Sequence, residues 1–131
     1  MPRIAHLYFR TAIVFLIAGI CIGLKMAISQ DHSVIGAHAH ANLLGWVTMA
    51  IFGGYYALNP EKAERRIAML QYGVYTFGVA LMVPALYMML SGNMAMEPVV
   101  GISSLITFVG VLMFAFIIFS SSPAPRAAPA E

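Results

Sequence analysis

The chain has very few charged side chains. Asp, Glu, Lys and Arg make up only 9% of its 131 residues, whereas a soluble domain usually contains about 25%. Hydrophobic residues make up 61% of the sequence. So few polar side chains cannot cover a globule that faces water, and the composition therefore predicts a membrane protein. The net charge of +2 is too small to indicate nucleic acid as a partner.

Cysteine is almost absent as well. Cys21 is the only one in the chain, which excludes a disulfide within the chain and a metal site built from cysteines. The basic N-terminus precedes an apolar run over residues 11–24, as in a signal peptide. Because no small-residue cleavage site follows that run, we expect it to be a retained membrane helix.

Long apolar stretches account for most of the chain. A helix needs roughly 20 apolar residues to cross a bilayer. Four stretches qualify, at about residues 8–29, 34–58, 67–90 and 99–119. They are continuous rather than alternating, which argues against the strands of a barrel. We therefore predict an all-α integral membrane four-helix bundle that forms one domain over residues 1–120. The Pro-, Ala- and Ser-rich tail, residues 121–131, is expected to be disordered.

Lys and Arg predict the direction of the spans. Both termini and the second loop would carry most of them: Arg3, Arg10, Lys62, Arg65, Arg66 and Arg126. The other side would carry only Lys25. Because cytoplasmic loops are rich in Lys and Arg, this pattern predicts cytoplasmic N- and C-termini in a multi-pass protein of a bacterial inner membrane. Tyr55, Tyr56 and Tyr72 flank the inner loop and are expected to anchor it at the membrane interface.

Two histidines lie close together at the outer end of the second expected span, in the sequence GAHAHANLLGW (Gly36 to Trp46). Ionisable groups inside a span are costly, and so His38 and His40 are candidates for function. On a regular helix they would point about 200° apart, and so they cannot chelate one metal ion together. His38 would share a face with Asn42, and a neighbouring copy of the chain is the first expectation for what His38 faces.

The cofactor that suits these histidines is haem. Neutral imidazole is a common ligand of haem iron and also binds copper well. A haem fits an apolar, glycine-lined groove, and Lys25 on the outer side would suit its propionates. The alternative is copper, held by His38 together with four methionines near the outer end of the third span, because thioethers bind Cu(I). These methionines are Met88, Met89, Met94 and Met96.

The segment His40-Ala41-Asn42-Leu43-Leu44 resembles the second helix of the catalytic subunit of haem–copper oxidases and nitric oxide reductases. The wider HAHANLLGW phrase is also similar to small proteins related to that subunit and to nitric-oxide-response membrane proteins of denitrifying bacteria. The resemblance implies that His40 is an axial ligand of a haem b. It also implies a four-helix unit that, as a homotrimer, would imitate the twelve helices of the oxidase subunit.

The same resemblance limits what one chain can do. The oxidase subunit needs six histidines, whereas the spans here contain two, and so whether the protein is an enzyme stays open. We expect a small inner-membrane haem b protein that transfers electrons, senses gas or redox state, or supports a respiratory complex. The alternatives are a copper-binding membrane protein and an accessory structural subunit of a larger membrane complex.

Overall fold

The computed structural model describes residues 1–121, and these form helices joined by short turns. The disorder expected over residues 121–131 lies, apart from Ser121, outside the described residues. The helices, in chain order, are α1 (Arg3–Ser29), α2 (Ile35–His40), the π-helix η1 (Ala41–Thr48), α3 (Met49–Leu58), α4 (Pro60–Ala63), α5 (Arg66–Leu90), the 3₁₀-helix η2 (Met94–Met96) and α6 (Glu97–Phe119).

The all-α class predicted from the sequence is confirmed for the described residues, and the helices are of the kind that suggests a membrane protein. Three helical segments are long and apolar enough to cross a bilayer, namely α1, α5 and the segment Met94–Phe119 that contains η2 and α6. The second expected span is a succession of three shorter helices, α2, η1 and α3, which follow one another without a break in the chain. A regular α-helix was expected there, and the eight-residue π-helix is a departure from that expectation.

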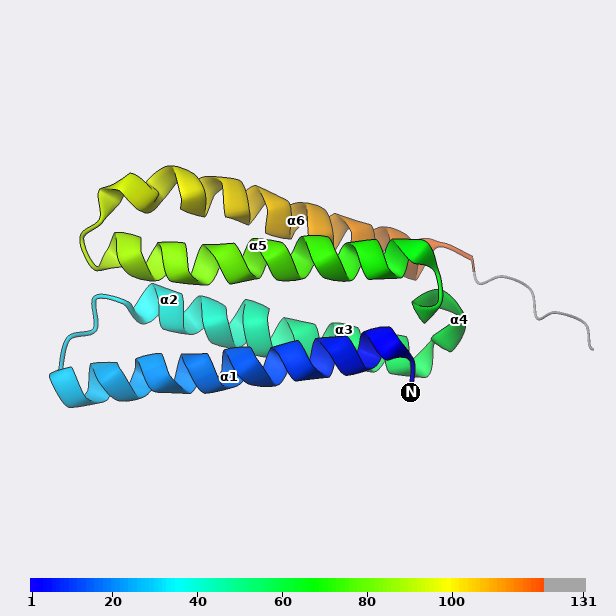
Figure 1. The fold of residues 1–131 in the computed structure, drawn as a ribbon, viewed down its shortest axis with the longest axis horizontal. Helices are drawn as coiled ribbons and strands as arrows, with labels where there is room; N and C mark the ends of the chain where they lie inside the picture. Colours follow the sequence, from blue (N-terminus) through cyan, green and yellow to red (C-terminus); the bar gives the residue numbers. More distant parts are fainter. Residues whose placement is uncertain (122–131) are drawn as a thin grey trace, which may run out of the picture.

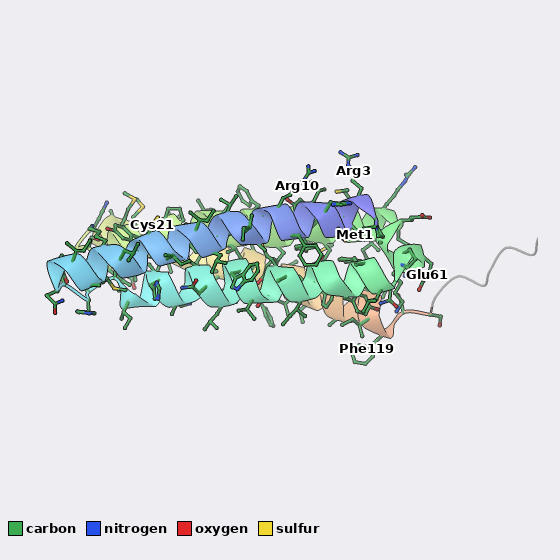
Figure 2. All side chains as sticks on the ribbon, turned by 90° about the horizontal axis from the view of Figure 1, so that it is seen from below. Met1, Arg3, Arg10, Cys21, Glu61 and Phe119 are labelled. Carbon is green, nitrogen blue, oxygen red and sulfur yellow. The ribbon has the colours of Figure 1, made fainter. Side chains whose placement is uncertain are left out.

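The helices run side by side along the long axis of the molecule (Figure 1). α5 packs most extensively against α6, whereas α1 packs against α3 and η1. The N-terminus, α4 and the end of α6 lie at the same end of the bundle (Figures 1 and 2). Arg3 and Arg10 point away from the bundle near that end (Figure 2). Most of the basic residues of the described chain therefore lie toward one end.

Glycines allow α5 and α6 to approach each other closely. A Cβ atom on Gly78 would lie 2.7 Å from the backbone nitrogen of Thr107. A Cβ on Gly110 would lie 2.8 Å from the Cα of Tyr75. Both contacts are with backbone, which cannot rotate away as a side chain can. These two glycines thus set the separation of the two helices, as small residues do in membrane bundles.

A buried amide on α5 joins this helix to three others, α1, α3 and α6. Gln71 is fully buried, and its Oε1 accepts hydrogen bonds from the hydroxyls of Tyr8 at 2.6 Å and Tyr56 at 3.1 Å. Its Nε2 donates to the carbonyl of Gly110 at 3.2 Å. The interfacial role predicted for Tyr56 is therefore wrong, because its ring is buried in the core. Tyr55 is half-buried, and its hydroxyl accepts a hydrogen bond from Lys62.

Candidate functional site

The histidine segment is packed antiparallel against α1. A Cβ on Gly45 would lie 2.4 Å from the ring of Phe15, and a Cβ on Gly19 would lie 2.6 Å from Oδ1 of Asn42. One turn further along α1, a Cβ on Gly23 would lie 2.9 Å from the imidazole of His38. Gly19 and Gly23 of α1, which are four residues apart, thus provide the space that the side chains of Asn42 and His38 occupy.

His38 is held between α1 and its own helix. Its Nδ1 lies 2.7 Å from the carbonyl oxygen of Gly19, and because a carbonyl only accepts, this nitrogen carries the proton. The amide nitrogen of Asn42 lies 3.4 Å from both ring nitrogens of His38. The same amide nitrogen donates to the carbonyl of His38 at 3.1 Å. His38 therefore faces α1 of its own chain, whereas a neighbouring copy was expected.

His40 points to a different environment, as the angular separation on a helix predicts. Its Nδ1 donates to the carbonyl of Gly36 at 2.7 Å, one turn earlier in the same helix. Within residues 1–121, Nε2 of His40 has no hydrogen-bond partner. The half-buried imidazole lines a cavity of about 160 Å³ together with Ala39, Leu43 and Leu44. The free lone pair of His40 is thus set among apolar side chains.

The π-helix begins at the residue after His40, and two of its backbone carbonyls accept hydrogen bonds from side-chain hydroxyls. The carbonyl of Leu44 accepts a hydrogen bond from the Tyr75 hydroxyl of α5 at 3.0 Å. The Thr48 hydroxyl donates to the carbonyl of Leu43 at 2.7 Å. π-Helical turns are rare and occur frequently at functional sites. The apolar pattern of residues 41–48 is also that of a regular helix, and so it does not predict the π-helix. Nor does it predict the hydrogen bond from Tyr75.

Lys25 lies in a separate site. Its Nζ donates to the hydroxyl of Tyr87 on α5. It also lines a cavity of about 430 Å³ at the ends of α1 and α5, together with Asp31 and Ser91 among others. His40 is not part of this lining. Lys25 and His40 thus line different cavities, and the pairing of Lys25 with a haem propionate stays a prediction.

The four methionines lie at the turn between α5 and α6. Met88 and Met94 are exposed, while Met89 and Met96 are half-buried. The hydrogen bonds of His38 go to Gly19 and Asn42 instead. In residues 1–121 no group of three or more His, Cys, Asp or Glu side chains is placed to hold a metal ion. No described contact joins the methionines to His38, and so no observation favours a copper site made from both.

Comparison with known proteins adds no relative. No family model matches the chain, and no match was found among curated proteins or solved structures.

Proposed function

We propose that the protein is a small membrane protein that binds haem b through His40. The observation that supports this is the state of the imidazole. Its Nδ1 proton is bound to the Gly36 carbonyl, and its Nε2 is free beside apolar side chains. Metal-binding histidines almost always donate the other ring N–H in this way, which fixes the tautomer and the ring orientation. His38 has the same kind of Nδ1 bond, but Asn42 and α1 enclose it.

The cavity at His40 fits only part of such a ligand. Its volume of about 160 Å³ is smaller than the roughly 300–1,000 Å³ of typical small-molecule sites. The His40 face would therefore form one wall of the site. A second copy of the chain, in the homotrimer implied by the resemblance, or a larger respiratory complex would form the other wall. The exposed apolar side chains of Leu43 and Val47 on the same face suit such a contact.

We also propose that the four-span topology applies, with α2, η1 and α3 together forming the second of the four spans. The end of the bundle that carries Arg3, Arg10 and the α4 region would face the cytoplasm of a bacterium. His40 would then lie in the outer half of the inner membrane. Lipid would surround the many exposed apolar side chains of α1 and α6.

The proposed role is electron transfer, sensing of gas or redox state, or support of a respiratory complex. A haem supplies redox and gas-binding chemistry when it is bound. The residues of this chain would hold the iron and exclude water from it: His40 as the ligand, with Ala39, Leu43 and Leu44 as the apolar surround. Whether the protein also catalyses a reaction stays open.

The test is an absorption spectrum of the purified protein before and after reduction with dithionite, combined with elemental analysis. We expect a Soret band, α and β bands on reduction, and iron in the sample. A colourless protein without iron would refute the proposal. Copper in that colourless sample would support the copper-binding alternative, and the absence of both metals would support an accessory structural role.

A further inference from the structure

A groove runs along α5, and no histidine lines it. One stripe of α5 lines it from Arg66 through Leu70 and Gly73 to Phe77, at helical spacings of three and four residues. Ile106 of α6 lines the groove as well. The volume is about 670 Å³, and all the lining side chains except Arg66 are apolar.

Gly73 accounts for the depth of the groove. A Cβ at this position would meet no atom within 4 Å, and so the glycine is not required for helix packing. On either side of it, Leu70 is 60% exposed and Phe77 is 59% exposed. These side chains project from the helix while the glycine between them leaves a hollow. An unbranched chain can lie in a hollow of this shape.

The open end of the groove carries a free cation. Nearby, Lys62 donates to the hydroxyl of Tyr55 and to the carbonyl of Ile118, and Arg65 donates to the hydroxyl of Ser120. The exposed guanidinium of Arg66, by contrast, has no hydrogen bond or ion pair in the part of the chain that the structure describes. A basic side chain at the end of a membrane helix attracts acidic headgroups.

The length of the groove matches one leaflet of a membrane. At a rise of about 1.5 Å per residue, Phe77 lies about 16 Å along the helix from Arg66. That is roughly half of the ~30 Å hydrocarbon thickness of a bilayer. Arg66 is the first residue of α5, one of the helices long enough to cross the membrane, and so its charge would stand at headgroup level.

We propose that this groove binds one acidic phospholipid. The phosphate pairs with the Arg66 guanidinium, whose planar donors suit phosphate oxygens. One acyl chain lies over Gly73, between Phe77 and Ile106. A lipid explains both the cation at one end and the one-leaflet length of the apolar part, whereas a second protein helix would not require the cation.

The experiment is native mass spectrometry of the full-length protein in detergent, with added phosphatidylglycerol or phosphatidylcholine. We expect one phosphatidylglycerol per chain to be retained preferentially. The Arg66→Gln variant should lower its apparent affinity by about tenfold, because a charge-assisted contact to phosphate is lost. The Gly73→Leu variant adds a side chain at a position where a Cβ meets nothing within 4 Å. It should displace the lipid while helicity in circular dichroism stays unchanged.

Two matched variants serve as controls. Arg10→Gln removes an exposed cation elsewhere, and Gly101→Leu adds the same side chain at another open glycine. Neither should change lipid retention. Equal retention of the two lipids, or equal losses in the Arg10→Gln and Arg66→Gln variants, would overturn the proposal. A dimer that becomes monomeric only in the Gly73→Leu variant would overturn it too, since a second copy would then occupy the groove.

Discussion

The contact between α5 and α6 makes a quantitative prediction for Gly110→Ala. The added Cβ would lie 2.8 Å from the Cα and Cβ of Tyr75 and 3.0 Å from its backbone nitrogen. Ordinary contact begins at 3.4 Å, so the helices must separate locally by about 0.6 Å, the difference between 3.4 and 2.8 Å. Overpacking of this kind costs about 1–3 kcal/mol. The carbonyl of the same residue also accepts the Gln71 hydrogen bond, which the shift would lengthen.

Gly101→Ala is the matched control on the same helix. A Cβ there would meet nothing within 4 Å, and alanine is favoured over glycine in a helix by up to about 1 kcal/mol. Its stability should be unchanged or higher. The assay is reversible unfolding by sodium dodecyl sulfate in mixed micelles, followed by circular dichroism. Equal free energies of unfolding for the two variants would refute the close packing of α5 on α6.

Two further predictions concern polar groups. Gln71→Leu removes the acceptor of two buried tyrosine hydroxyls and should lower the free energy of unfolding by about 1–3 kcal/mol in the same assay; an unchanged value would contradict the buried network. The pKa of Asp31 lies below its usual value, because its carboxylate accepts hydrogen bonds from the backbone and side chain of Ser33 and lies near Lys25 and His32. Its contribution to stability is therefore present above the unfolded pKa of about 3.9 and is lost as pH falls through the folded pKa. Carboxyl NMR should show a higher midpoint for Asp31 in the Ser33→Ala variant, and an identical midpoint would argue against this turn.

The sequence predicted the helical class and the position of the long apolar segments, because both follow from composition and run length. It also predicted that the two histidines face different surroundings, which follows from their spacing on a helix. It did not predict that His38 meets Gly19, since pairing between helices depends on which faces meet across the bundle. The π-helix was missed for the same reason, because the hydrogen bond from Tyr75 to the carbonyl of Leu44 is a tertiary contact that the sequence of residues 41–48 does not indicate.

The burial of Tyr56 was missed because of a partner that is far away in the sequence. A tyrosine near a loop is usually an interfacial anchor. Gln71 supplies a buried acceptor for its hydroxyl, and this removes the need for water. Nothing near Tyr56 in the sequence indicates that partner.

Binding of haem iron by Nε2 of His40 is tested most directly by the ratio of haem to protein in purified His40→Ala. The controls are the wild-type protein and His32→Ala, which alters an exposed loop histidine. We predict that wild type and His32→Ala retain equal haem, quantified by the pyridine haemochrome method, and that His40→Ala loses nearly all of it while its helicity persists. Equal haem in His40→Ala and wild type would show that His40 is not the haem ligand.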